Sequence, residues 1–128
     1  MSDHTSHANR AAFERFVDLF YTQKRVADAF AFLVADDYRQ HNPTIADGPE
    51  AAVAALTPKF DGSPAARFEV QRILVDGDLA MVHVKATRPG NQPAAVADIY
   101  RFENGRIVEH WDVLQPVPTN PVHDHPMF

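Results

Sequence analysis

The sequence predicts an α+β domain in which helices come first and a run of antiparallel strands follows. Apolar side chains recur at helical spacing between residues 8 and 60, whereas residues 67–114 alternate apolar and polar side chains between turn signals. The 128 residues, 45% of them hydrophobic, are enough for one domain with a core of its own. We therefore predict a single domain over residues 1–128.

The first predicted helix begins near residue 8. Phe13, Phe16, Val17 and Phe20 fall at i, i+3, i+4 and i+7, so they form one apolar stripe. We expect this stripe to pack in the core. The polar residues 1–7 before the helix are expected to be a flexible tail.

Turns that contain Gly, Pro or Asp separate the remaining predicted elements. A short strand is expected to end before Pro43, because the residue before a proline favours extended geometry. Asn104-Gly105 between two strand-like runs predicts a hairpin. The expected elements are a second helix from residue 26 to near residues 36–37, a strand over 38–42, a third helix over 50–60 that is interrupted near Pro58, strands over 67–75, 79–87, 94–102 and 106–114, and a flexible surface tail over 119–128.

Asp98, in the first strand of the hairpin, is the leading candidate for a catalytic residue. It shares a strand face with Val96, Tyr100 and Phe102, because side chains two residues apart point to the same side. A carboxyl group held among apolar side chains is suited to general acid/base catalysis. The alternative is a structural carboxylate inside a buried hydrogen-bond network.

The length of the hairpin loop decides which residues share the face of Asp98. If the loop is residues 104–105 alone, Asp98 shares a face with Trp111. If the loop has three residues and ends in a bulge, the register moves by one, and Asp98 then shares a face with His110 and Asp112. The local sequence leaves both registers open.

The hairpin segment DIYRFENGRIVEHWDVLQPVP, residues 98–118, resembles the SnoaL-like branch of the nuclear transport factor 2-like superfamily. The run from Tyr38 to Pro43, followed by Gly48, is similar to the same branch. The resemblance implies a cone-shaped, curved sheet, antiparallel or mixed, that N-terminal helices close around a pocket for a small molecule. The superfamily includes polyketide cyclases, a ketosteroid isomerase, an epoxide hydrolase, a dehydratase and members without catalytic activity.

The resemblance also implies roles for two residues on neighbouring strands. The aspartate that matches Asp98 looks like the acid/base of the cyclases and like an oxyanion-hole donor in the ketosteroid isomerase. The cyclases also have a pocket histidine on the strand that carries His83 here. Because the two strands are consecutive, we expect His83 to lie near Asp98 and to hold its proton in place.

The epoxide hydrolase of the superfamily has a catalytic aspartate that matches Asp112, and the position matching His110 also faces its pocket. By this likeness His110 and Asp112 point inward and Trp111 points outward, which favours the three-residue loop. Two neighbours on the earlier strand, Tyr38 and His41, are expected to contact the ligand.

Asn42 is also expected to contact the ligand, and it argues against steroid isomerisation. Asn42 occupies the position of the ketosteroid isomerase base but cannot abstract a proton. The position of that enzyme's oxyanion tyrosine matches Phe16 here, which has no hydroxyl group. Both differences from the ketosteroid isomerase argue against steroid isomerisation and favour a different reaction.

The amino-acid composition argues against several classes of binding partner and cofactor. The net charge is −5 without a basic run, which disfavours nucleic acid and anionic membranes. There is no cysteine, no HExxH motif and no phosphate-binding loop, so we expect no metal and no cofactor. No stretch is long and apolar enough to span a membrane, and a cytoplasmic protein is expected. An apolar outer sheet face with Ile99, Trp111 and Val113 predicts a homodimer.

The leading functional prediction is cofactor-free acid/base catalysis of the cyclase or isomerase type on a hydrophobic, carbonyl-containing small molecule. Asp98 would move the proton and His83 would tune it. One alternative is an epoxide hydrolase or dehydratase-like enzyme that uses Asp112. The other is a ligand-binding or interaction domain without catalysis.

Overall fold

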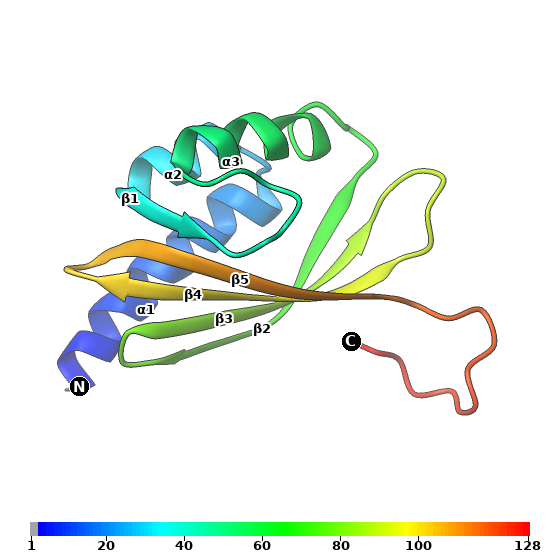
Figure 1. Ribbon diagram of the computed structural model, residues 1–128. Coiled ribbons are helices and arrows are strands. Elements are labelled where there is room, and N and C mark those ends of the chain that lie inside the picture. Colours follow the sequence, from blue (N-terminus) through cyan, green and yellow to red (C-terminus); the bar gives the residue numbers. More distant parts are fainter. Residues whose placement is uncertain (1–2) are drawn as a thin grey trace.

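The helices cover one face of a curved, five-stranded sheet (Figure 1). The computed structural model describes residues 3–128, with side-chain contacts from residue 5 onward. In chain order the elements are α1 (Asp3–Val17), the π-helical turn η1 (Asp18–Thr22), α2 (Val26–Leu33), β1 (Val34–Gln40), α3 (Pro49–Leu56), the 3₁₀ turn η2 (Thr57–Lys59), β2 (Arg67–Asp76), β3 (Leu79–Thr87), β4 (Ala94–Glu103) and β5 (Arg106–Pro116).

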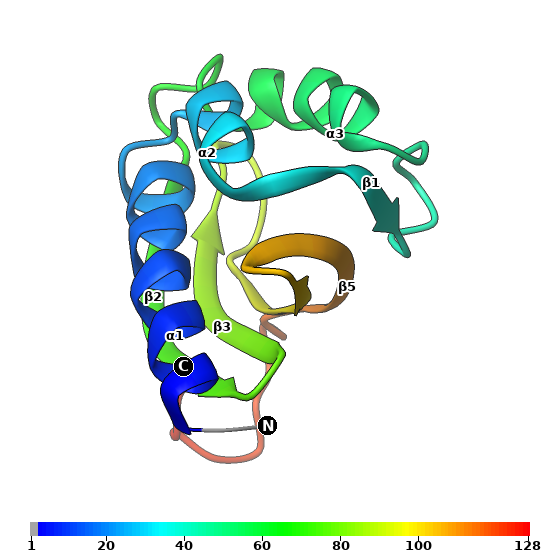
Figure 2. The same ribbon diagram turned by 90° about the vertical axis from the view of Figure 1, so that its left-hand side faces the viewer.

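The strand order is β1-β5-β4-β3-β2. β1 runs parallel to β5, and the other neighbouring strands are antiparallel. Seen end-on, the sheet curls from β2 to β1 while α1, α2 and α3 lie over its concave side (Figure 2). The predicted α+β class and the curved, mixed sheet with helices on one side are confirmed, and the sheet does not close into a barrel.

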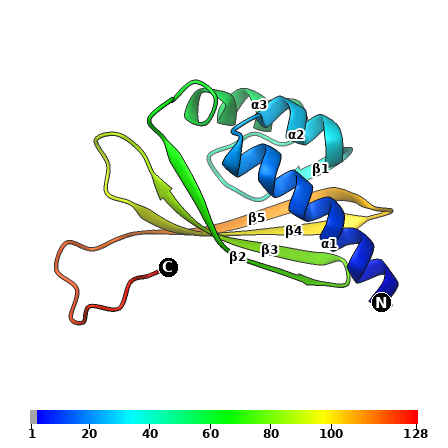
Figure 3. The same cartoon turned by 180° about the vertical axis from the view of Figure 1, so that it is seen from behind.

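The first helix lies across the strands (Figure 3) and contributes the centre of the core. Phe13 and Phe16 are fully buried, with ring centroids 5.4 Å and 5.5 Å from that of Tyr100 on β4. Val17 and Phe20 are also buried. The predicted apolar stripe is therefore core, and it holds α1 on the inner face of the sheet.

The prediction of a tail before residue 8 is wrong for residues 3–7, which belong to α1; residues 1–2 lie outside the described part. The β2–β3 turn explains the extra helical residues. The backbone N–H of Gly77 donates to Ser6 Oγ at 2.8 Å, and Asn9 Nδ2 donates to the Gly77 carbonyl at 2.8 Å. At the other end, residues 117–128 contain no helix or strand and are mostly exposed, as expected of a surface tail.

The boundary between α2 and β1 lies earlier than predicted. The helix ends at Leu33, and the strand spans Val34–Gln40 instead of residues 38–42. Val34 is buried and pairs with Ile107 of β5, and its carbonyl accepts a hydrogen bond from Arg106 at 3.1 Å. This pairing with a distant strand is not visible in the local sequence. The third helix is likewise shorter and changes to 3₁₀ geometry around Pro58, where an interruption was predicted.

The hairpin loop has two residues. Asn104 and Gly105 have φ angles of 52° and 76°, as a type I′ loop requires, and Glu103 pairs directly with Arg106. The three-residue loop favoured by the family resemblance is therefore wrong.

The register nevertheless shifts by one residue, because β5 contains a bulge directly after the loop. Phe102 opposes Ile107, whereas Arg101 opposes Glu109, so Val108 is the extra residue. A bulge displaces every later residue of β5 by one position relative to β4. The two-residue loop and the bulge together give the register that the three-residue loop would have given.

The bulge places two acidic residues side by side on the inner face. Asp98 is directly opposite Asp112, and Tyr100 is directly opposite His110. Trp111 pairs with Ile99 on the outer face. The predicted inward orientation of His110 and Asp112 is confirmed.

Candidate functional site

A cavity of about 130 Å³ opens between the helices and the concave face of the sheet. Its apolar part is aromatic, and its polar part lies where β4 and β5 meet the end of β1. The phenylalanines in its lining are Phe20, Phe30, Phe60 and Phe68. Phe60 and Phe68 stack with their centroids 3.8 Å apart, which makes one flat wall.

Asp98 lies at the centre of the polar part and uses both carboxyl oxygens. Tyr21 Oη donates to Oδ2 at 2.5 Å, and Nε2 of His110 lies 2.9 Å from Oδ1. Tyr100 Oη is 2.7 Å from Tyr21 Oη. Tyr21 donates its only hydroxyl proton to Asp98. In the hydrogen bond between the two tyrosines, Tyr100 is therefore the donor and Tyr21 the acceptor. Asp98 and His110 are 8% and 7% exposed, so the pair is nearly shielded from water.

Gln40 determines which ring nitrogen of His110 carries a proton. The backbone N–H of Asn42 points at the Gln40 side chain at 3.0 Å, and a backbone N–H can only donate, so the atom it meets is the amide oxygen. The same oxygen lies 2.7 Å from Nδ1 of His110, which must therefore be protonated. Nε2, the nitrogen that faces Asp98, is left to share a proton with the carboxyl group.

Asp112 is held beside this pair by an amide. Asn42 Nδ2 donates to Oδ2 of Asp112 at 2.7 Å, and both residues line the cavity. Oδ2 of Asp112 is 3.9 Å from Nε2 of His110. Among the described residues, no side chain or backbone group bonds to Oδ1 of Asp112, so this oxygen is available to a ligand.

All three tyrosines of the chain line the cavity. Burial raises the pKa of the Tyr21, Tyr38 and Tyr100 hydroxyl groups, and the negative charge of Asp98 raises each pKa further. The hydroxyl groups therefore remain protonated donors at neutral pH. Tyr38 Oη already accepts a hydrogen bond from Gln40 Nε2 at 2.9 Å, so its own proton can be donated to a ligand.

Tyr21 reaches the sheet because α1 ends in a π-helical turn. The backbone N–H of Gln23 bonds to the carbonyl of Asp18 at 2.9 Å, five residues back. Such wide turns are frequent at functional sites. Tyr21 stacks on Phe20, with ring centroids 4.7 Å apart, and its hydroxyl group points into the polar network.

Asp98, His110 and Asp112 also form the group of described residues best placed to hold a metal ion, since one ligand atom of each lies within 4.8 Å of the others. The present hydrogen bonds use those atoms differently. His110 Nε2 and Asp98 Oδ1 are 2.9 Å apart with a proton between them. A metal ion would have to displace that proton, so the arrangement favours proton transfer.

The predicted partnership of His83 with Asp98 is wrong. His83 is opposite Ala97 on β4, whereas Asp98 is opposite Val82, so the two side chains point to opposite faces of the sheet. The imidazole lies on the outer face with Nδ1 2.8 Å from Arg72. The histidine beside Asp98 is His110 of β5, which flanks β4 on the side opposite to β3.

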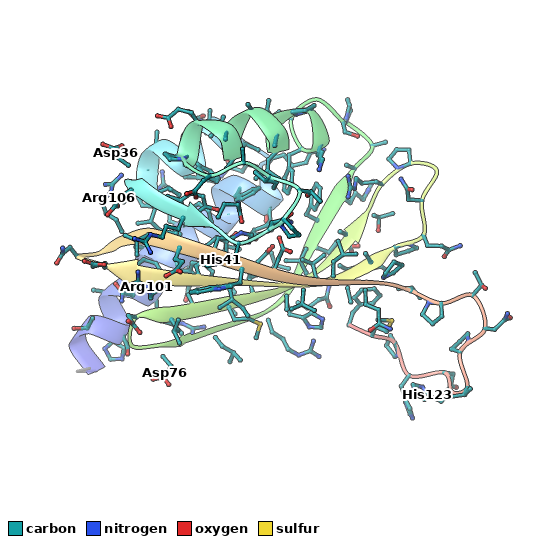
Figure 4. The ribbon with its side chains drawn as sticks, in the orientation of Figure 1. Asp36, His41, Asp76, Arg101, Arg106 and His123 are labelled. Atoms are coloured by element: carbon teal, nitrogen blue, oxygen red, sulfur yellow. The ribbon has the colours of Figure 1, made fainter. Side chains whose placement is uncertain are left out.

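His41 also lies outside the cavity. Its ring stacks on Trp111 with centroids 4.8 Å apart and planes 9° apart, and Nε2 is 2.6 Å from Glu109. Figure 4 shows His41 beside β5, with Arg101 of β4 below it; Arg101 bonds to Glu109 at 2.8 Å. His41 is therefore not among the residues that line this cavity, where its ligand contact was predicted. Tyr38 and Asn42 line the cavity.

Three members of the polar network, Tyr21, Tyr100 and Gln40, were not predicted from the sequence. Tyr21 is at i+8 from Phe13, which continues the apolar stripe of α1, so helical spacing could have found it. Tyr100 was expected on the face of Asp98, but only as an apolar neighbour. No sequence pattern points to Gln40, because its role depends on the pairing of β1 with β5.

A curved sheet with helices over its concave face and a cavity between them is the arrangement of a nuclear transport factor 2-like protein. The family model of the SnoaL-like domain matches residues 13–110, and the chain belongs to this family. No protein of curated function matches the chain. No helix in the described part could span a membrane.

Three solved structures illustrate the fold. An NTF2-like protein of unknown function from Mesorhizobium loti has 22% identity, a TM-score of 0.74 and coverage of 86% of this chain and 93% of the other. A protein provisionally named a ketosteroid isomerase, from Kribbella flavida, has 20% identity, a TM-score of 0.72 and coverage of 92% and 85%. A protein provisionally named a polyketide cyclase, from Bacillus cereus, has 20% identity, a TM-score of 0.70 and coverage of 89% and 78%. At this identity the likeness establishes the fold alone.

Proposed function

We propose that the protein is an enzyme that moves protons within a small apolar carbonyl compound, in a cyclase or isomerase type of reaction without a cofactor. One observation carries the proposal. The side chains of Asp98 and His110 lie 2.9 Å apart at the floor of an apolar cavity, close enough to share a proton, and the carboxylate of Asp112 lies beside them. A proton donor and a proton acceptor next to an apolar site are the parts that enolisation needs.

Each side chain would have one role in the enolisation of the ligand. The ligand carbonyl oxygen accepts a hydrogen bond from Tyr38 Oη, which stabilises the charge that develops on it. The proton between Asp98 and His110 leaves its present 2.9 Å contact and passes to the same oxygen. Oδ1 of Asp112 removes the proton from the neighbouring carbon. Asn42 keeps the other oxygen of Asp112 occupied and so orients the carboxylate.

The cavity volume supports a small ligand. About 130 Å³ is close to the roughly 150 Å³ of an engineered cavity that binds benzene. The enclosed space therefore suits one ring or a short branched chain, with further groups at the mouth. The stacked Phe60 and Phe68 offer a flat surface to such a ring.

The test is exchange of carbon-bound hydrogen for deuterium. A panel of small aryl ketones is incubated with the protein in D₂O, and exchange next to the carbonyl group is followed by NMR. Asp98→Asn can still accept from Tyr21 and donate to His110, so it should fold and lose about 10²-fold or more of the exchange rate. His83→Gln, on the outer face, is the matched control and should exchange normally. Equal rates for Asp98→Asn and the unchanged protein would refute the proposal.

The hydrogen bond between Asn42 and Asp112 favours one second candidate, the opening of an epoxide by water. A carboxylate and an amide side by side can hold a water molecule and remove its proton. Incubation of small epoxides in ¹⁸O-labelled water would then give diols that contain the label. Asp112→Asn should abolish this reaction while Asp98→Asn only reduces it.

We also propose that the protein forms a homodimer through the outer face of the sheet. Four apolar residues lie in one cross-strand row on that face, and Leu74 is 60% exposed. Next to the row Val113 is 65% exposed. A continuous apolar strip of this kind suits a second copy of the same face. The four residues of the row are Leu74, Met81, Ile99 and Trp111.

A further inference from the structure

Two cationic side chains line the cavity together with the acidic floor. They are Lys59, at the end of η2, and Arg88, in the loop after β3. Lys59 is exposed and Arg88 is half-buried. Within the described part of the chain, neither side chain has a hydrogen bond or an ion pair. By contrast, Arg10 and Arg25 both have carboxylate partners.

The two cations are separated from the floor by an apolar stretch. On the inner face of β3, Val82 lies opposite Asp98, and Val84 and Ala86 follow toward the cavity mouth. Arg88 is six residues beyond Val82, just past the end of β3 at Thr87, and its side chain lines the same cavity. The cavity is therefore acidic at one end, apolar in the middle and basic at the other end.

We propose that Lys59 and Arg88 form an anion subsite, and that the substrate is a small carboxylate with an apolar middle and a carbonyl group at the far end. Arginine binds carboxylates through two parallel hydrogen bonds, and lysine adds a second positive charge. The carboxylate of Asp112, whose partner Asn42 is neutral, repels an anion from the floor, so only one orientation of the ligand is favourable. The carbonyl part of this description rests on the proposed function, whereas the anion subsite stands on the two cations.

The test compares two ligands that differ only in charge. The protein is titrated with 3-phenylpropanoate and with 3-phenylpropanamide, and binding is followed by ¹⁵N NMR. The acid should bind about tenfold more tightly than the amide, and added salt should reduce this preference. Equal affinities, or no binding of either ligand, would overturn the proposal.

Two double variants test whether Lys59 and Arg88 cause the preference for the acid over the amide. Lys59→Gln/Arg88→Gln should bind acid and amide equally, with the affinity for the amide unchanged. Because neither side chain has a partner in the fold, circular dichroism should show a normally folded variant. Arg10→Gln/Arg25→Gln removes the same total charge from the protein surface and should keep the preference. A preference that survives in the first variant, or disappears in both, would overturn the subsite.

A third variant separates this proposal from the proposed function. Asp98→Asn leaves both cations in place, so it should keep the preference for the acid even where hydrogen exchange is lost. If no ketone exchanges but the acid preference is present and depends on Lys59 and Arg88, the anion subsite is correct and the catalytic proposal is wrong. A loss of the preference in Asp98→Asn would count against the subsite.

Discussion

His110 Nε2 lies 2.9 Å from Oδ1 of Asp98, while Nδ1 of the same ring lies 2.7 Å from the side-chain oxygen of Gln40. The Gln40 oxygen can only accept, so Nδ1 keeps a proton and the second proton is shared between Nε2 and Asp98. The pair has no net charge, whether the proton is on the ring or on the carboxyl group. It can therefore hold a transferable proton in an apolar cavity without the cost of a buried net charge.

The tyrosines should resist ionisation until the protein unfolds. Burial, and then the charge of Asp98, raises the pKa of Tyr21, Tyr38 and Tyr100 above the usual value of about 10. A raised pKa in the folded state stabilises the fold fully below pH ~10, and that contribution is lost as the pH rises further. Ultraviolet absorbance should show all three tyrosinates appearing together with loss of the circular dichroism signal. One tyrosine that ionises near pH 10 in the folded protein would contradict this.

Glu109 should contribute to stability at neutral pH but not in acid. Its hydrogen bonds from Arg101 and then from His41 lower its pKa below the usual 4.5. A lowered pKa in the folded state stabilises the fold above pH 4.5, and the contribution is lost as the pH falls through the folded-state pKa. Glu109→Gln should therefore lower the melting temperature at pH ~7, and the difference from the unchanged protein should shrink as the pH falls through the folded-state pKa of Glu109.

Glu103→Gln is the matched control for Glu109. Glu103 has a longer contact with the same arginine, 3.4 Å from Arg101, and its side chain is 60% exposed. An exposed ion pair of this kind adds little stability. A similar change in melting temperature for both variants would show that the geometry around Glu109 is not what stabilises the fold.

Trp111 should anchor the proposed dimer. It lies in the apolar row of the outer face, and the ring of His41 stacks on it. Trp111→Ala should weaken association by about 2 kcal/mol or more, as measured by light scattering over a range of concentrations. Hydrogen exchange in the ketone assay should be retained, because Trp111 points away from the cavity. Val122→Ala, a 98% exposed position in the tail, is the control. A 14.3 kDa monomer at high concentration would refute the dimer.

The sequence predicted the fold class because its signals are local. The apolar stripe of α1 and the Asn104-Gly105 loop depend on residues only a few positions apart, and both are present. Val34 and β1 were misplaced because their strand geometry comes from pairing with β5, 70 residues or more later in the chain. A contact of this kind leaves no periodic pattern in a short window.

Only part of the site could be predicted, because the rest of it also depends on strand pairing that the local sequence does not show. Asp98 and Asp112 could be named from their strands, but their partners depend on the register. The bulge at Val108 reverses the faces that the loop alone would give, and no local signal marks it. His83 was assigned to Asp98 from the order of the strands alone, and the pairing of Val82 with Asp98 puts it on the other face.

The last prediction concerns the tautomer of His110, which can be measured without a substrate. In the unchanged protein ¹⁵N NMR of the ring should show a proton on Nδ1 throughout the pH range in which the protein is folded. Gln40→Leu leaves Nδ1–H without an acceptor, at a cost of about 1–3 kcal/mol, so the proton should move to Nε2. Nε2–H would then donate to an ionised Asp98, the shared proton would be lost, and hydrogen exchange should fall. Gln40→Glu keeps an acceptor for Nδ1–H and should retain the original tautomer. An unchanged tautomer in Gln40→Leu would show that Gln40 does not control the proton on His110.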